Sequence, residues 1–174
     1  MAHVNIEIKA HCPDARRVRG ILLTQGALFK GRDRQTDVYF NVPQGRLKLR
    51  RGAIENALIY YRRPDDHGPR QSDVQLCAFS PASGDAMEAL FAEMLGVWVR
   101  VVKDREIYFI NNVKFHIDSV EGLGRFVEIE AIDADGSIGR ERLLEQCRGY
   151  MAMLEITEGD LVDCSYSDML IGRA

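Results

Sequence analysis

Charged residues occupy every second position in several short segments of this chain, with apolar residues between them. Glu128 and Glu130 flank Ile129, and Glu7 and Lys9 flank Ile8. Residues two apart on a β-strand point to the same face of the sheet. Each segment therefore predicts a strand with one charged face and one apolar face, which limits the folds open to the chain.

An ordinary antiparallel sheet with one face in water also alternates polar and apolar residues. Here, however, the pattern recurs in five segments and the charges are sorted by sign: positions 46, 48 and 50 are all cationic, and positions 128 and 130 are both acidic. Like charges on neighbouring same-face positions repel each other unless a cation lies between them. We therefore expect the rows to face a common interior that binds charged species.

Length and composition limit the remaining possibilities. The 174 residues suit one domain, spanning 1–174, and the net charge of -3 argues against general nucleic-acid binding. No apolar run approaches the ~20 residues needed to span a bilayer, so no membrane is expected. The four cysteines are widely scattered, which is typical of reduced thiols in a cytoplasmic protein.

The order of predicted elements indicates an α+β protein. A helix begins near Pro13 and ends near Gly26, two more cover 83–95 and 138–154, and a short tail occupies 165–171. A polar loop at 64–69 is a candidate cover for a binding site. Strands are expected at 4–10, 34–41, 46–51, 57–63, 72–79, 97–103, 105–110, 113–119 and 125–132. With eight or so strands, the mainly antiparallel sheet is most economically closed into a β-barrel, or tunnel, with helices packed outside.

The charged faces would line the inside of this barrel, and the helices would cover the apolar faces. Burying so many ions requires pairing or a charged ligand. The predicted acidic lining is Glu7, Asp118, Glu128 and Glu130. The predicted cationic lining is Lys9, Arg46, Lys48, Arg50, Arg62, Lys103 and Arg105. An all-oxygen carboxylate site suits Mg²⁺ or Mn²⁺, and guanidinium groups match phosphate oxygens, so a polyphosphate bridged by a divalent metal satisfies both sets.

These residues resemble the CYTH domain superfamily, the triphosphate tunnel metalloenzymes, which includes class IV adenylate cyclases and thiamine triphosphatases. The family begins with a Glu-x-Glu-x-Lys strand, which Asn5-Ile6-Glu7-Ile8-Lys9 matches except at Asn5. Further matches are Asp37-Val38-Tyr39-Phe40, Arg46-Leu47-Lys48-Leu49-Arg50, Arg62 before Pro64, Lys103-Asp104-Arg105, Asp118 through Gly124, Phe126-Val127-Glu128-Ile129-Glu130 and Ser165 through Leu170. Their order and spacing cover most of the chain.

The resemblance implies an eight-stranded antiparallel tunnel that binds a triphosphate with divalent metal. The acidic lining would hold the metal and the cationic lining the phosphates. The residues expected to carry catalysis are Glu7, Lys9, Lys103, Glu128 and Glu130. Asn5 departs from the family pattern: its amide oxygen can still coordinate a hard cation, but one negative charge is lost.

Three functions remain open at this point. A class IV adenylate cyclase would convert ATP to cyclic AMP and pyrophosphate, and the segment 37–41 favours that branch by resemblance. A triphosphatase would hydrolyse tripolyphosphate, thiamine triphosphate or a nucleoside triphosphate. A non-catalytic polyphosphate or nucleotide sensor is the third option, which Asn5 makes credible. The expected partner is a triphosphate-containing small molecule, ATP or polyphosphate, and a homodimer is one option for the assembly.

Overall fold

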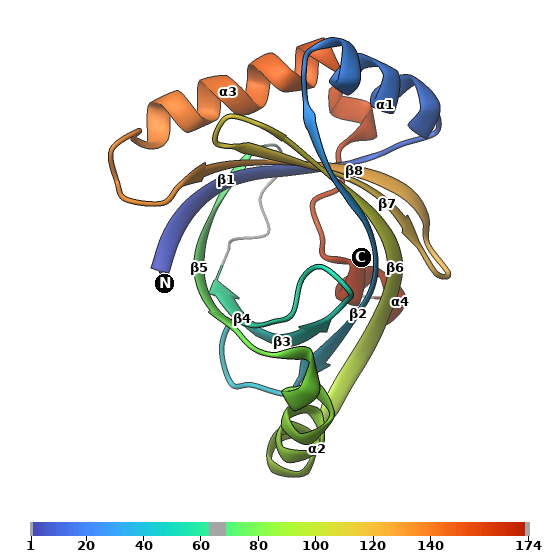
Figure 1. Ribbon diagram of the computed structural model, residues 1–174, viewed down its shortest axis with the longest axis vertical. Helices are drawn as coiled ribbons and strands as arrows, with labels where there is room; N and C mark the ends of the chain where they lie inside the picture. Colours follow the sequence, from blue (N-terminus) through green and yellow to red (C-terminus); the bar gives the residue numbers. More distant parts are fainter. Residues whose placement is uncertain (1, 63–68, 173–174) are drawn as a thin grey trace.

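Eight antiparallel strands close into a barrel, as the sequence predicts. The computed structural model describes residues 2–62 and 69–172. Around the barrel the strands follow the order β1-β5-β4-β3-β2-β6-β7-β8, and β1 pairs with β8 to close the ring (Figure 1). The strands are β1 (Ala2–His11), β2 (Leu28–Phe40), β3 (Arg46–Arg51), β4 (Ala57–Arg62), β5 (Arg70–Ala78), β6 (Val97–Ile110), β7 (Val113–Val120) and β8 (Gly124–Asp133).

Helices occur where the sequence predicts them. They are α1 (Ala15–Thr24), α2 (Gly84–Leu95), α3 (Arg140–Met153) and α4 (Tyr166–Leu170), with short 3-10 turns at Pro81–Ser83 and Glu158–Asp160. Asp14 caps α1 by accepting the backbone N–H of Arg17 at 3.0 Å. Gly26 follows α1 and Gly96 follows α2, each with a positive φ that a side chain would disfavour.

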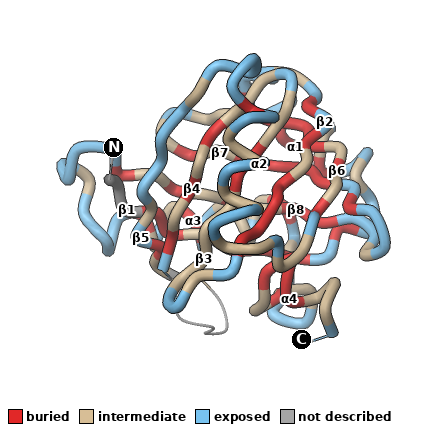
Figure 2. The backbone as a smooth tube through the Cα atoms, turned by 90° about the horizontal axis from the view of Figure 1, so that it is seen from below, coloured by how far each residue is buried: buried red, intermediate tan, exposed pale blue. Residues whose placement is uncertain are grey.

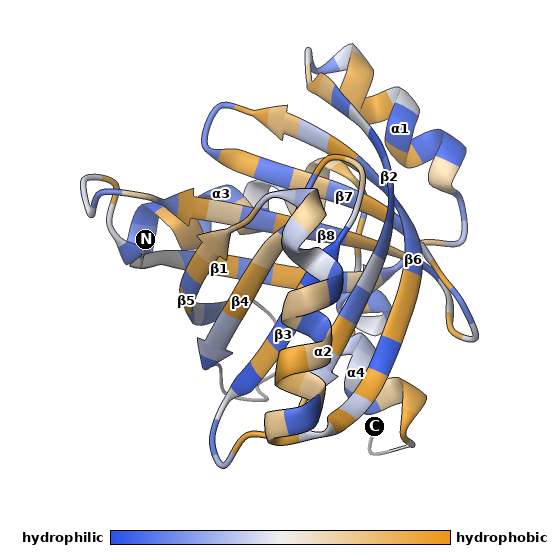
Figure 3. Cartoon of the chain, turned by 60° about the horizontal axis from the view of Figure 1, so that its bottom comes forward, coloured by the Kyte–Doolittle hydropathy of each residue, from blue (hydrophilic) through white to orange (hydrophobic). Residues whose placement is uncertain are grey.

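The apolar cluster with the most buried residues lies outside the barrel wall, whereas smaller clusters that include Tyr39, Ile59 and Tyr61 lie inside. Figure 3 shows hydrophilic and hydrophobic residues alternating along the strands. α1 and α3 cover the outer faces of β1, β7 and β8, where Ile6, Ile8, Phe115 and Ile129 are buried together with Leu143 of α3. Figure 2 shows that most of the buried residues lie within the strands. Helices thus shield the apolar faces, which leaves the charged faces for the interior.

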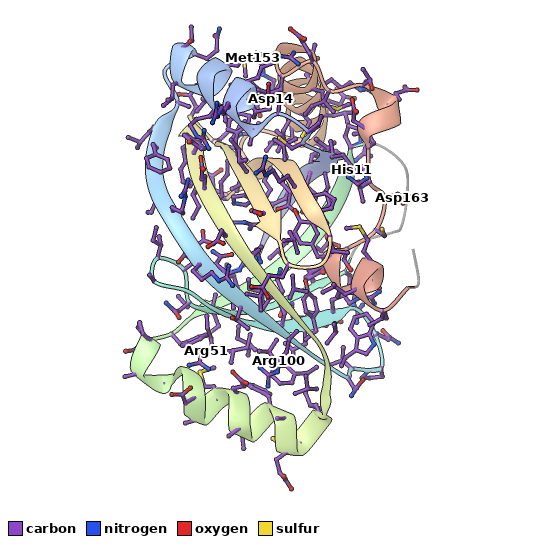
Figure 4. The ribbon with its side chains drawn as sticks, turned by 90° about the vertical axis from the view of Figure 1, so that its right-hand side faces the viewer. His11, Asp14, Arg51, Arg100, Met153 and Asp163 are labelled. Atoms are coloured by element: carbon purple, nitrogen blue, oxygen red, sulfur yellow. The ribbon has the colours of Figure 1, made fainter. Side chains whose placement is uncertain are left out.

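α2 covers β2 and β3 at another part of the wall, where Val38, Phe40 and Leu49 pack against Phe91. Two cations tie the helix to the strands. Glu88 of α2 pairs with Arg51 of β3 at 2.8 Å and with Arg100 of β6 at 2.6 Å, and Figure 4 shows both arginines beside the helix. The outward-facing charges of Arg51 and Arg100 therefore help to hold α2 against the strands.

Some element boundaries differ from the prediction. Residues 97–110 form one strand and not two, because Asp104 continues the ladder opposite Ser119 and turns outward to Arg34. β2 begins at Leu28, earlier than expected, with an irregularity between Phe29 and Gly31. The predicted loop at 64–69 lies almost entirely outside the described residues. Among the helices of the described chain, none combines the length and apolarity needed to cross a bilayer.

Candidate functional site

The barrel encloses a cavity of about 720 Å³ that is lined by charged side chains. Its cations are Lys9, Lys48, Arg50, Lys103, Arg105 and Lys114, and its carboxylates are Glu7, Asp37, Glu55, Glu128 and Glu130. Among the described residues, six cations therefore face five carboxylates. A nearly balanced interior of this size can be buried because the charges pair with one another.

Asp37 of β2 gathers three cations, two from β3 and one from β6. Its carboxylate accepts from Arg50 Nε at 2.8 Å, from Lys103 Nζ at 2.8 Å and from Lys48 Nζ at 3.1 Å. Burial opposes ionisation, but the attraction of Arg50, Lys103 and Lys48 holds the pKa of Asp37 well below its usual range. Asp37 thus keeps the three cations together in the absence of an anionic ligand.

Lys103 is the group most perturbed by this crowding. The Lys103 side chain is fully buried, and this burial lowers its pKa from 10.5 to about 7. The positive charges of Arg50, Arg105 and Lys48 lower the pKa further, whereas the attraction of Asp37 opposes the shift. The amine can therefore gain or lose a proton near neutral pH. This property is compatible with the catalytic role that the family resemblance implies for Lys103.

Three predicted carboxylates come together on β1 and β8. Glu7 lies directly opposite Glu130 in the strand register, and Glu128 is the next inward position of β8. His116 of β7 contacts Glu128 through Nδ1 at 3.1 Å, and the ligand atoms of His116, Glu128 and Glu130 lie within 4.8 Å of one another. Burial would raise the pKa of Glu128, but Arg105, His116 and Lys9 hold it well below its usual value.

These residues fit a divalent metal. Carboxylate oxygens are the ligands that Mg²⁺ and Mn²⁺ prefer. The side-chain oxygen of Asn5 is also buried in the cavity lining and has no hydrogen-bond partner among the described residues. A buried acceptor in this position is costly unless a ligand satisfies it, so a nearby cation would account for it.

Asp118 shares Arg105 with Glu128, but it is not among the described residues that line the cavity. Its carboxylate is bound by Arg105, with Nε–Oδ1 at 2.7 Å, and it accepts the hydroxyl of Tyr166 at 2.9 Å. Both oxygens are therefore engaged, and we leave Asp118 out of the proposed metal site. Tyr166 is buried, and burial together with Asp118 raises its pKa well above the usual value, so it stays protonated and donates.

α4 packs across one end of the tunnel. Lys9 Nζ lies 3.9 Å from the centre of the Tyr166 ring and donates to the backbone carbonyl of Cys164 at 3.1 Å. Arg46 of β3 reaches this end, where it pairs with Asp168 at 2.9 Å and lies over the ring of Trp98. Arg46 is therefore placed at the closed end and not along the cavity wall.

The loop between β3 and β4 projects into the ring of strands in Figure 1, and it follows Arg51, at the other end of β3 from Arg46. Asp33 fixes it by accepting the backbone N–H groups of 53, 54 and 55. The loop places Glu55 against Arg50 at 3.1 Å, Gln35 at 3.1 Å and Lys114 of β7. Arg50 and Lys114 hold the pKa of Glu55 far below its usual value, although burial opposes this.

Arg62 is not brought into the tunnel, contrary to the sequence prediction. Its neighbours Ile59 and Tyr61 on β4 line the cavity, so Arg62 falls on the outer face. There it is exposed and donates to the Tyr60 hydroxyl at 2.8 Å and to Gln44 at 3.2 Å. We leave it out of the proposed site.

Three charged residues of the described cavity lining are absent from the sets predicted from the sequence. Lys114 shares its face with His116 and Asp118, so the alternation on β7 contained the signal. Asp37 lies two residues before Tyr39, another cavity residue. The sequence indicates Asp37 only as part of the family motif Asp37-Val38-Tyr39-Phe40. Glu55 comes from a loop, where no periodicity indicates the direction of a side chain.

Comparisons with known proteins agree with this arrangement. The CYTH domain model matches residues 3–162. A Methanocaldococcus jannaschii protein named "Putative adenylate cyclase MJ0240" is 25% identical over 95% of this chain and 98% of its own length.

Solved structures share the fold. The PH1012 protein of Pyrococcus horikoshii OT3 has a TM-score of 0.78 and 25% identity over 94% of this chain and 98% of its own. HpAC1 of Hippeastrum, described as a "putative adenylyl cyclase" with a dominant triphosphatase activity, has a TM-score of 0.63 and 15% identity over 98% of this chain and 95% of its own. The closed tunnel, the paired charge rows and the match over residues 3–162 together show that this chain belongs to the CYTH domain family.

Proposed function

We propose that this protein is a metal-dependent enzyme that acts on a triphosphate inside the tunnel, with ATP cyclisation as the first candidate reaction. One observation carries the proposal: the cations gathered by Asp37 and the carboxylates of Glu7, Glu128 and Glu130 line the same cavity. A single phosphate or carboxylate ligand would need fewer cations, and a nucleic-acid backbone would not need the acidic row.

The charge balance explains why both a metal and a polyphosphate are required. The described lining holds one more cation than carboxylates, whereas a triphosphate ester carries about four negative charges. A divalent ion adds two positive charges and offsets most of the charge of the three carboxylates. The tunnel is therefore suited to a metal–triphosphate complex and poorly suited to either component alone.

Each group then has a defined task. Arg50, Lys48 and Lys103 bind phosphate oxygens in place of Asp37, and Arg105 holds Glu128 in position. Glu7, Glu128 and Glu130 would hold the metal, which when bound stabilises negative charge on the phosphate oxygens. Catalysis would come mainly from positioning and charge neutralisation, as in other phosphoryl transfers.

The two candidate reactions share this machinery and differ in the nucleophile. In a cyclase the ribose 3′ oxygen bonds to the α-phosphorus, its proton passes to a base, and pyrophosphate leaves. In a triphosphatase a water molecule attacks the terminal phosphorus, a proton is likewise removed, and the bond to the bridging oxygen breaks, so that orthophosphate forms and the diphosphate part of the substrate leaves. Lys103 Nζ, with a pKa of about 7 in the free protein, gains a proton when the phosphates bind and then neutralises their charge, so we do not assign it as the base.

The relatives support both reactions. The name of the M. jannaschii relative favours cyclisation, and the description of HpAC1, a protein with the same fold, favours triphosphate hydrolysis as the second candidate. A non-catalytic sensor is the third, because Asn5 stands where the family motif has glutamate.

Product analysis distinguishes these candidates. Purified protein is incubated with Mg²⁺ or Mn²⁺ and, separately, ATP, tripolyphosphate and thiamine triphosphate. Cyclic AMP with equimolar pyrophosphate identifies a cyclase, whereas orthophosphate from any substrate identifies a triphosphatase. Tight binding with no product from any of the three would overturn the enzymatic proposal in favour of the sensor.

A further inference from the structure

The carboxylate of Glu55 lies across the bore of the tunnel, on the loop that projects into the ring of strands (Figure 1). One of its oxygens accepts from Arg50 Nη1 of β3 at 3.1 Å, and the other pairs with Lys114 of β7. In the closed ring β3 and β7 are three places apart, so the two cations come from nearly opposite parts of the wall. A single carboxylate thus bridges the tunnel beside Arg50.

The loop backbone holds Glu55 in this place. The Asp33 side chain is fully buried and accepts the backbone N–H groups of Ala53 at 2.6 Å, Ile54 at 3.0 Å and Glu55 at 3.0 Å. A Cβ added at Gly52 would lie 2.5 Å from Asp33 Oδ2, so only glycine permits this close approach. Glu55 therefore cannot withdraw from the bore without breaking these hydrogen bonds.

Glu55 also keeps its negative charge. Burial would raise its pKa, but Arg50, Lys114 and His116 hold this pKa far below its usual value. The amide of Gln35 donates to the same carboxylate at 3.1 Å. A ligand in the tunnel therefore meets a negative charge that is fixed in position.

The inward cations of β3 form a row with a protein carboxylate at each end. The first member, Arg46, pairs with a carboxylate of α4 at 2.9 Å. The next two, Lys48 and Arg50, bind Asp37. Arg50 also contacts Glu55, which follows the strand. A chain of phosphates that replaces Asp37 thus has a carboxylate of the protein on either side.

The cavity continues at the loop end with apolar side chains. Phe79 lies beside the loop, where its backbone N–H donates to the carbonyl of Asn56. Phe109 is opposite Lys114 in the β6–β7 register, and Ile132 also contributes to this part of the lining. A phosphate that extended past Glu55 would lie beside a carboxylate and against apolar groups, which is unfavourable for a charged group.

We propose that Glu55 sets the upper limit on the phosphate chain: its fixed charge ends the phosphate-binding row at Arg50, so that chains longer than a triphosphate are rejected. This inference rests on the proposed function, because it assumes that the phosphates bind where Asp37 gathers the cations. Like charges repel more strongly in a partly buried site than in water. The selectivity comes from repulsion of the longer ligand and not from a stronger contact with the shorter one.

Inorganic tripolyphosphate and tetrapolyphosphate test the inference by calorimetric titration, with Ca²⁺ as the divalent ion to slow turnover. The longer chain carries more charge, so a row of cations with an open end would bind it more tightly. We expect the wild-type protein to bind tetrapolyphosphate no more than threefold tighter than tripolyphosphate. Because the two ligands differ only in length, the ratio of their affinities reports the limit on the chain.

Two variants of Glu55 separate charge from shape. In Glu55→Gln the additional phosphate meets a neutral amide, so the ratio of tetrapolyphosphate to tripolyphosphate affinity should rise at least fivefold. Glu55→Asp keeps the charge and withdraws it by one methylene, so the ratio should rise less than in Glu55→Gln. Glu88→Gln is the matched control, because Glu88 also binds two arginines but lies outside the barrel. It should leave the ratio within twofold of the wild-type value.

The outcomes separate the inference from the proposed function. A wild-type protein that binds tetrapolyphosphate more than threefold tighter overturns the inference, and so does a rise of less than fivefold in folded Glu55→Gln. An equal rise in Glu55→Asp or in Glu88→Gln overturns it as well, since the charge at this position would not be the cause. If Glu55→Gln does not fold, an unchanged ratio in Glu55→Asp contradicts the inference. If neither ligand binds the wild-type protein, the proposed function fails and the inference fails with it.

Discussion

The guanidinium of Arg105 binds Asp118 through Nε at 2.7 Å and simultaneously contacts Glu128 at 2.6 Å. Asp118 lies directly opposite Arg105 in the β6–β7 register. This pairing separates two carboxylates that look alike in the sequence. Asp118 is used to position Arg105, whereas Glu128 remains part of the carboxylate group beside Glu130.

Asp118→Asn therefore should weaken the fold more than the metal site. Loss of the charge partner leaves Arg105 buried and only partly paired, and we expect the free energy of unfolding to fall by about 2 to 4 kcal/mol. Mn²⁺ affinity, measured by calorimetry, should change less than threefold, whereas Glu130→Gln should lower it at least tenfold. Equal losses of Mn²⁺ affinity in the two variants would indicate that Asp118 is also a metal ligand.

Arg50→Ala tests the cation group. Arg50 offers a forked donor beside Lys48 and Lys103, so several phosphates share these groups. We expect tripolyphosphate affinity to fall at least tenfold and orthophosphate affinity less than threefold in calorimetric titrations. Arg51→Ala is the matched control, because Arg51 points outward to α2. Equal losses for both ligands in Arg50→Ala would indicate a pocket for a single phosphate.

We expect Lys103 to take up a proton when a triphosphate binds. With a pKa of about 7, the amine is largely neutral at pH 8 in the free protein. An anionic ligand stabilises its charged form and raises the pKa, so triphosphate binding at pH 8 should take up a proton and weaken as the pH rises from 7 to 9. Calorimetry in buffers of different ionisation enthalpy counts the proton, and Lys103→Met should abolish the uptake. Uptake that persists in Lys103→Met assigns the proton to another group.

The sequence predicted most of the tunnel because alternation is a local property. Each of β1, β3 and β8 has one mainly charged and one mainly apolar face, and a register slip would expose the apolar face. β4 gives no such signal: Ala57, Ile59 and Tyr61 alternate with Leu58 and Tyr60, which are equally apolar. The sequence alone therefore could not determine the face on which Arg62 lies.

Pairing between distant segments accounts for the remaining differences. The position of Asp118 opposite Arg105 depends on the register of β6 and β7, which alternation does not specify. Glu55 reaches Lys114 only because Asp33 fixes the loop backbone from another strand. Lys103-Asp104-Arg105 suggested a break between strands, yet the outward Asp104 has its own partner in Arg34.

The variant Asn5→Glu restores the first glutamate of the Glu-x-Glu-x-Lys motif and tests the effect of this departure from the family pattern. The Asn5 side chain is buried beside the acidic row, and its oxygen has no partner among the described residues. Because ligand charge tunes affinity for hard cations, the added carboxylate should lower the Mn²⁺ concentration for half-maximal activity at least threefold. Reduced turnover with no such shift would mean that the site is adapted to a neutral ligand.

The most direct test of the metal-binding role of Glu128 and Glu130 compares turnover in the wild-type protein with turnover in the double variant Glu128→Gln/Glu130→Gln. Both changes are nearly isosteric and relieve repulsion between like charges, so thermal unfolding should show a folded variant. With Mn²⁺ and ATP or tripolyphosphate, we expect metal-dependent product from the wild type and at least a hundredfold loss in the variant. Unchanged product formation in the folded double variant would contradict the claim that these carboxylates hold the metal in the tunnel.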